Sequence, residues 1–166
     1  MMLSIEELFQ QIESNSAGRD YKLKMSYIEV YNEVIKDLLN NKNENLELRE
    51  DGMKGISVAG VLEIMTTNTE EIMSYIRQGN KNRTKEFTEA NDASSRSHAV
   101  LQITVEHKDK AHGISAEINM AKLSLIDLAG SERASKTKNS GLRLVEGANI
   151  NRSLLALGNC INALCD

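Results

Sequence analysis

The feature that most constrains the fold is an apolar run that ends in an acidic residue and a glycine. Residues 118–128 have the pattern of a strand, and residues 123–128 are almost continuously apolar, as in a sheet that is covered on both faces. Asp127 closes this run and Gly130 follows it. In open α/β sheets the ligand crevice lies at the carboxyl ends of strands, where an acid can hold a magnesium-bound water and a glycine lets a backbone amide approach a phosphate. Taken alone, this pattern is a weak signal, because a strand end followed by an ordinary turn also produces it.

The rest of the chain alternates between the periodicities of strands and helices. Further strands are predicted at residues 21–27, 46–49, 56–64 and 99–106. Helices are predicted at residues 5–14, after the capping box Ser4-Ile-Glu-Glu7, and at residues 69–78, with Gly79 just past the end. A third helix is predicted at residues 147–165. Val34, Ile35, Leu38 and Leu39 also have helical spacing. Strands alternating with helices imply a layered α/β fold, and the 166 residues read as one domain.

Charge is divided unevenly along the chain. The net charge of −4 argues against nucleic acid as a partner, and no apolar run approaches the ~18 residues of a membrane span. Residues 1–132 carry 22 acids and 15 bases, whereas residues 133–166 carry two acids and five bases, namely Arg133, Lys136, Lys138, Arg143 and Arg152. This basic end suits an acidic partner, although a solvated basic loop fits the charge count as well. Cys160 and Cys165 lack metal or disulfide spacing and are predicted to be buried, reduced thiols.

A second polar motif, Asn91-Asp-Ala-Ser-Ser-Arg-Ser-His98, lies about thirty residues before Asp127-Leu-Ala-Gly-Ser-Glu132. Consecutive hydroxyl groups can ligate Mg²⁺ and orient a water molecule. The arginine can pair with a carboxylate that closes over the same site. The first motif alone could be an ordinary polar loop, but the two strings together have little chance of arising by accident.

These motifs, with three further stretches, resemble the kinesin motor domain almost end to end. The further stretches are Tyr27-Ile-Glu-Val-Tyr-Asn-Glu33, Asp37-Leu-Leu39 and Asn149-Ile-Asn-Arg-Ser-Leu-Leu-Ala-Leu-Gly-Asn159. The strings Lys81-Asn-Arg-Thr84, Ser97-His-Ala-Val100 and Val145-Glu-Gly147 are most similar to the class-eight kinesins, which move to and regulate microtubule plus ends. The resemblance implies that residues 1–166 form a partial kinesin-type P-loop NTPase fold, α/β in class, with a central mixed sheet and flanking helices.

The resemblance also implies functional segments and a nucleotide site for ATP and Mg²⁺. Switch I corresponds to residues about 88–98, switch II to 127–132, the microtubule-binding loop to about 133–146 and the switch II helix to about 147–165. Ser95 and Asp127 would hold Mg²⁺ directly or through water, with Asn91 and Ser94 beside the γ-phosphate and the attacking water. The Gly130 amide would sense the γ-phosphate, and an Arg96–Glu132 salt bridge would close the two switches. Such a site promotes phosphoryl transfer by positioning and electrostatics.

Microtubules are the partner that the resemblance implies, which places the protein in the cytoplasm on the microtubule cytoskeleton. The basic residues Arg133, Lys136, Lys138, Arg143 and Arg152 would contact the acidic tubulin surface. Arg49 and Lys54 would form a weaker second set of contacts. An association with other segments of the motor is also expected.

The chain departs from the family pattern in one respect. No Gly-x-x-x-x-Gly-Lys-[Ser/Thr] phosphate loop occurs in it, so the phosphate-loop half of the fold, before residue 1, and the end after the switch II helix are expected to be missing. We therefore expect an uncovered sheet edge beside strand 118–128, very weak ATP binding and no ATPase activity from these residues alone. The leading hypothesis is a fragment of an ATP-driven microtubule motor. The alternatives are a catalytically inactive microtubule-binding module and a GTPase, although the guanine-reading string Asn-Lys-x-Asp is absent.

Overall fold

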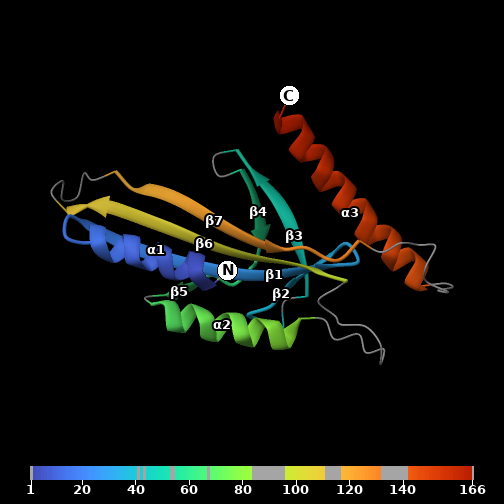
Figure 1. Ribbon diagram of the computed structural model, residues 1–166, viewed down its shortest axis with the longest axis horizontal. Coiled ribbons are helices and arrows are strands. Elements are labelled where there is room, and N and C mark those ends of the chain that lie inside the picture. Colours follow the sequence, from blue (N-terminus) through green and yellow to red (C-terminus); the bar gives the residue numbers. More distant parts are fainter. Residues whose placement is uncertain are drawn as a thin grey trace.

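The computed structural model describes residues 2–40, 42, 44–52, 55–66, 68–83, 96–110, 117–131 and 142–165. Its elements, in chain order, are α1 (Met2–Asn15), β1 (Arg19–Tyr31), β2 (Val34–Asp37), β3 (Glu44–Asp51), β4 (Gly55–Ala59), β5 (Ile64–Thr66), α2 (Thr69–Asn82), β6 (His98–Asp109), β7 (Asn119–Asp127) and α3 (Leu142–Cys165). The described strands form one sheet in the order β4-β3-β2-β1-β6-β7, with β5 paired to β1. Helices α1 and α2 lie on one side of this sheet, and α3 projects from its end (Figure 1).

The core lies between the sheet and the pair α1 and α2. The alternation predicted for residues 21–27 is confirmed, because Leu23, Met25 and Tyr27 are buried on the face of β1 toward the helices. Ile5 of α1 and Ile72 of α2 are each fully buried in the same cluster. Each such side chain contributes roughly 1.5–3 kcal/mol relative to leaving it exposed.

Gly79 lies inside α2, so the prediction that this glycine follows the helix end was wrong. The helix continues to Asn82, and Arg83 caps it by donating its backbone N–H to the carbonyl of Gly79. A Cβ atom at Gly79 would overlap Cδ1 of the Tyr27 ring. The glycine therefore permits close approach of α2 to β1, where the Tyr27 hydroxyl donates to Oδ1 of Asn80 at 2.7 Å.

Two other local predictions were also wrong. Val34 and Ile35 belong to strand β2, not to a helix, because Asn32 and Glu33 adopt positive φ values of 50° and 67° and turn the chain back against β1. A short apolar run of this kind does not distinguish helix from strand by spacing alone. Helix α1 begins at Met2, so Ser4 lies within its first turn and does not cap it.

All strand pairs in the described part of the sheet are antiparallel, so the mixed character implied by the resemblance is not seen within these residues. Strand β7 pairs with β6 and lies at one end of the strand order, where an uncovered edge was expected. Met120 and Ile126 in β7 are 57% and 53% exposed. The prediction that both faces of this strand are covered is therefore wrong for the described residues.

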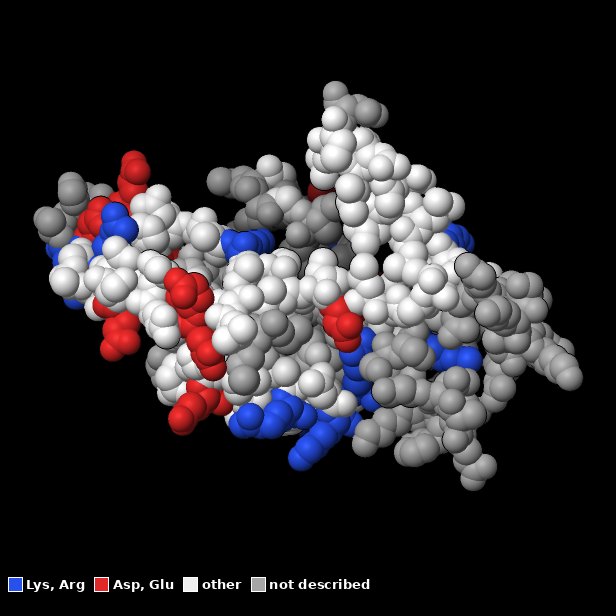
Figure 2. Space-filling view, in the orientation of Figure 1, with Lys and Arg blue, Asp and Glu red and all other residues white. Residues whose placement is uncertain are grey.

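Helix α3 has an apolar, exposed end. Ile150 is buried, but Ile161 and Leu164 are exposed, as are Cys160 and Cys165, which were predicted to be buried. Residues 153–165 carry no Lys, Arg, Asp or Glu, and the end of α3 is uniformly white on the face shown in Figure 2. Among the helices of the described residues, none combines the length and hydropathy that crossing a membrane requires.

Candidate functional site

The pairing of β6 with β7 brings the two polar motifs together. Ala99 lies opposite Asp127 in the antiparallel register. The residues just before β6 and just after β7 therefore meet at the same end of the sheet. Of the residues that the sequence predicted to meet here, Arg96, Asp127 and Gly130 lie in these described segments, whereas Ser95 and Glu132 lie outside them.

Arg83 connects these two segments from the end of α2. Its guanidinium donates to Oδ2 of Asp127 at 2.6 Å, and to the hydroxyl and the carbonyl oxygen of Ser97. The carboxylate of Glu29 lies 3.9 Å away and is fully buried, and Arg83 is 7% exposed. Charge-assisted hydrogen bonds of this kind fix the position of both partners.

Arg83 was not among the predicted site residues, although one signal in the sequence points to a partner of this kind. The inward positions of β1 run Tyr21, Leu23, Met25 and Tyr27, and the next residue in this alternation is Glu29. A carboxylate on a buried face requires a cationic or hydrogen-bonding partner. The pattern therefore predicts a buried partner for Glu29, but the sequence does not say which of the 20 Lys and Arg residues supplies it.

His98 joins the same site to helix α3. Its Nδ1 atom accepts a hydrogen bond from the backbone N–H of Ala129 at 3.1 Å, and its Nε2 atom lies 2.8 Å from the hydroxyl of Ser153. Burial, and then the positive charge of Arg83, lower the pKa of His98, while Asp127 acts in the opposite direction. The imidazole is therefore held in its neutral form near neutral pH.

The first half of α3 rests on the turn between β1 and β2. The amide of Asn149 donates to Oδ1 of Asn32 at 2.6 Å, and Arg152 lies 4.0 Å from Glu33. A small hollow of about 50 Å³ remains at this junction, and Arg96 and His98 are among the residues that line it. The side chain of Arg152 is 75% exposed, so it remains accessible to a partner.

The structure describes only some of the predicted site residues. Arg96, Asp127, Gly130 and Arg152 lie within the described segments, as does Arg49, whose side chain is 71% exposed. Outside the described residues lie Asn91, Ser94, Ser95, Glu132, Arg133, Lys136, Lys138 and Lys54, and of Arg143 only the backbone is described. The Arg96–Glu132 salt bridge and the magnesium ligand Ser95 therefore stay predictions.

Asp127 fits the predicted contact with a magnesium-bound water. Its side chain is 51% exposed although one oxygen accepts from Arg83. A carboxylate has lone pairs for several partners, so the ion pair with Arg83 leaves it able to accept from a metal-bound water. The exposed Gly130 follows on the same segment, after the buried Ala129.

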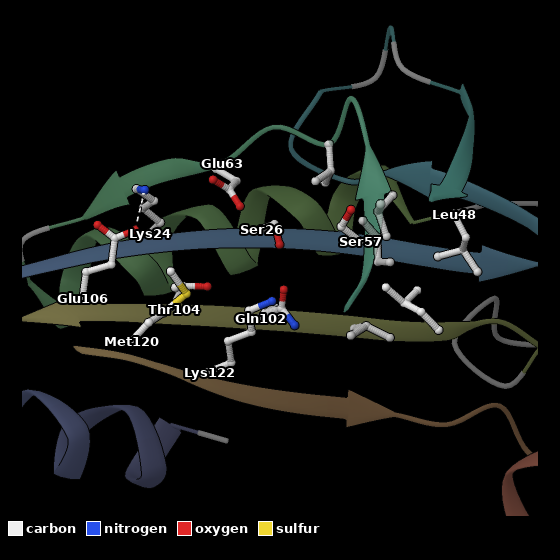
Figure 3. A pocket seen from close by; sticks show the side chains of 15 residues that line it. Lys24, Ser26, Leu48, Ser57, Glu63, Gln102, Thr104, Glu106, Met120 and Lys122 are labelled. Carbon is white, nitrogen blue, oxygen red and sulfur yellow. Dashed lines mark hydrogen bonds and ion pairs between the residues drawn. The ribbon is translucent and has the colours of Figure 1, made fainter. Parts of the chain in front are cut away.

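A larger groove lies on the sheet face away from α1 and α2. It has a volume of about 370 Å³ and is formed by the β3–β4 hairpin over β1, β6 and β7 (Figure 3). Lys24 and Glu106 form an ion pair of 2.7 Å at this groove, and Leu48 contributes from the hairpin. Its lining contains neither of the two polar motifs, so it is separate from the site between β6, β7 and α3.

Comparisons with known proteins agree with the motifs. The sequence model of the kinesin motor domain matches residues 1–166. The chain is 55% identical to the kinesin-like protein KIF19 of Homo sapiens over 163 residues, and 50% identical to the kinesin-like protein KIP3 of Saccharomyces cerevisiae over 167 residues. These alignments cover 98% and 99% of this chain, but 16% and 21% of the relatives, so the chain spans about a sixth to a fifth of their length.

Solved kinesin structures share the fold. A fast kinesin matches with a TM-score of 0.83 at 40% identity, over 99% of this chain and 46% of that structure. A KIF14 dimer with AMP-PNP in complex with a microtubule matches with a TM-score of 0.84 at 38% identity, over 98% of this chain and 47% of that structure. A further relative is the kinesin-like protein KIN-8B of Arabidopsis thaliana, at 49% identity over 99% of this chain and 20% of the relative. The chain therefore belongs to the kinesin motor domain family, and its curated relatives are class-eight kinesins.

Proposed function

We propose that these residues form the part of an ATP-driven microtubule motor that carries both γ-phosphate switches and the main microtubule-binding loop and helix. The observation that supports this most is the register of β6 against β7, which sets His98 beside the backbone of Ala129 and sets Ala99 opposite Asp127. Two segments that respond to one phosphate have to lie side by side, and this pairing provides that arrangement.

On the nucleotide side, each described residue has a role that its position allows. Asp127 would accept from a magnesium-bound water, and the amide of Gly130 would donate to the γ-phosphate. Arg83 fixes the Asp127 carboxylate by donating a hydrogen bond to one of its oxygens. Arg96 would pair with Glu132. Magnesium, when bound, supplies positive charge that offsets the phosphate oxygens.

On the microtubule side, the proposal rests on charge and on exposure. The loop at about 133–146 and α3 contain the five basic residues of the chain's last 34 positions. Arg152 is exposed on α3, and its nearest acidic neighbour, Glu33, lies at the limit of an ion pair. An acidic filament surface would attract such a segment in a salt-dependent way. The protein would then be located in the cytoplasm on microtubules.

Microtubule co-sedimentation of the full chain tests this assignment. We expect Lys136→Glu, Lys138→Glu and Arg143→Glu together to abolish pelleting, because three attractive contacts become repulsive. A matched control reverses the same charge at exposed positions away from α3, with Arg77→Glu, Lys81→Glu and Lys108→Glu. Equal pelleting of the first variant and the wild type would rule the assignment out.

A second candidate, a catalytically inactive microtubule-binding module, is favoured by the lack of a phosphate-loop string within these residues. We expect titration calorimetry to detect little or no ATP binding by the 166 residues alone. Low micromolar affinity would contradict this expectation. The genomic sequence upstream of Met1 separates the two candidates: the motor predicts an in-frame phosphate loop there, and a stop codon without one favours the module.

A further inference from the structure

His98 lies where three separate stretches of chain meet. It begins β6, contacts the backbone at Ala129 after β7, and contacts the hydroxyl of Ser153 in the middle of α3. The ends of this connection are shielded from water, since Ala129 and Ile150 are each 4% exposed. Hydrogen bonds in such surroundings are stronger than those exchanged freely with solvent.

The directions of the hydrogen bonds define one tautomer. The N–H of Ala129 can only donate, so Nδ1 of His98 is unprotonated and accepts. In the neutral ring Nε2 then carries the hydrogen and donates to the Ser153 hydroxyl. Ser153 in turn donates to the carbonyl of Ile150 at 2.8 Å. Every donor in this series has an acceptor, from Ala129 through to Ile150.

The charged groups around the ring do not compete for these bonds. Arg83, at the end of α2, is occupied by Asp127, Glu29 and Ser97. Arg96 lines the hollow beside the ring, together with Glu33 from the β1–β2 turn. Both ring nitrogens of His98 therefore have a partner, Nδ1 in Ala129 and Nε2 in Ser153.

We propose that His98 is a positioning residue that couples the orientation of α3 to the backbone beside Gly130. A displacement of α3 that carries Ser153 away would remove the acceptor of the Nε2 hydrogen of His98. The ring would then no longer be held in the tautomer whose Nδ1 accepts from Ala129, and that hydrogen bond would weaken. The coupling itself needs neither nucleotide nor microtubule. Its meaning for a motor rests on the proposed function, in which α3 binds the microtubule and the Gly130 amide senses the γ-phosphate.

Hydrogen exchange of the Ala129 amide, followed by NMR on the full chain without nucleotide or microtubules, tests the coupling. We expect Ser153→Ala to speed this exchange about fivefold, the effect of weakening one hydrogen bond, although Ala129 bonds to His98 and not to Ser153. Ser153→Thr keeps the hydroxyl and should restore slow exchange. Ser14→Ala is the matched control, because Ser14 also donates to a carbonyl of its own helix, that of Gln11.

Two substitutions of His98 separate the two halves of the connection. In His98→Asn the side-chain oxygen lies about where Nδ1 was, so it can still accept from Ala129, but the side chain is too short to reach Ser153. In His98→Gln the side-chain amide lies about where Nε2 was, so it can still donate to Ser153. We expect Ala129 to stay protected in His98→Asn and to exchange rapidly in His98→Gln. Adding Ser153→Ala to His98→Asn should then have no further effect.

The proposal would be overturned if Ser153→Ala left Ala129 exchange unchanged in the wild type, or changed it equally in the His98→Asn background. The exchange of the Leu101 amide in β6 reports whether a variant is simply less folded, because a general loss of stability would accelerate both amides. Since the assay contains no microtubules, a failure of the co-sedimentation experiment leaves its outcome unaffected.

Discussion

Arg83 is the residue on which the candidate site most depends. Its guanidinium contacts both Glu29 and Asp127, and its bonds to Ser97 add the segment before β6. Removing one partner of a buried charge pair leaves the other desolvated without compensation. A single side chain therefore stabilises the fold and also fixes the Asp127 carboxylate.

The first prediction concerns Arg83→Met. We expect it to lower the free energy of unfolding by about 3 kcal/mol, because the buried Glu29 and the Asp127 carboxylate would both lose a cationic partner. Urea denaturation followed by circular dichroism measures this change. Arg77→Met, on the exposed surface of the same helix, should have a small effect, and a loss of similar size there would show that the buried pair is not the cause.

The second prediction concerns pH and His98. Its pKa is lowered by burial and by Arg83, so the folded state binds fewer protons than the unfolded state in the range below the ordinary histidine pKa of about 6.5. The stabilisation from neutral His98 is complete above that value and is lost as the pH falls toward the lowered pKa. His98→Gln should therefore lose less stability than the wild type between about pH 7.5 and about pH 5.5, where carboxylates of ordinary pKa stay charged.

Urea midpoints of both proteins at the two pH values provide the comparison. All other titrating groups are common to the two chains, so they cancel in the difference. An equal loss in both proteins would mean that His98 does not contribute to the acid sensitivity.

At the scale of whole elements, the close contact between α2 and β1 leaves the least room for an added side-chain atom. The third prediction is that Gly79→Ala destabilises the protein by about 1–3 kcal/mol, because the added methyl group would overlap the Tyr27 ring. Thermal denaturation measures it. Gly158→Ala in α3 is the matched control, since no atom beyond its chain neighbours and the adjacent backbone of its own helix lies within 4 Å of its added methyl, and it should stabilise its helix by up to about 1 kcal/mol.

The sequence was most informative where one pattern extended over many residues. The alternation in β1 and the motif-bearing end of β7 were placed correctly, because side-chain periodicity and strand ends reflect the same backbone geometry. Val34 and Ile35 were misassigned, since the turn at Asn32 and Glu33 requires positive φ at two consecutive residues that are not glycine, which is uncommon. Gly79 was misread because its role depends on Tyr27, which is distant in the sequence.

The candidate site was predictable in part for the same reason. Asp127 and Gly130 could be assigned from a motif, which is a local property of the chain. Arg83 and the bond between His98 and Ser153 depend on which elements meet in space. Spacing along the sequence contains no direct information about such contacts.

For the whole molecule, the main property is the amount of exposed apolar surface. Leu155 and Leu164 on α3 are 65% and 87% exposed, and Ile118 and Met120 beside the sheet edge are 67% and 57% exposed. Surfaces of this kind mark contacts with other protein. The edge of β7, which ends the strand order of the described residues, adds backbone groups that another strand could bond.

The fourth prediction is that the isolated 166-residue chain self-associates. We expect light scattering after size exclusion to show species larger than a monomer, with Leu155→Glu and Leu164→Glu together reducing them by at least about half. Leu62→Glu is the control, at a leucine 38% exposed in a different part of the surface. A monomer at all concentrations tested would contradict the prediction.

The uncharged end of α3 has a consequence for how ionic strength should act on this protein. A contact made by residues 153–165 excludes water without pairing any charges, so dissolved ions hardly weaken it, and strongly hydrated ones such as sulfate reinforce it. Contacts of the preceding basic segment fade as ions accumulate around them. Two adjacent stretches of one chain would thus respond in opposite senses to the same salt.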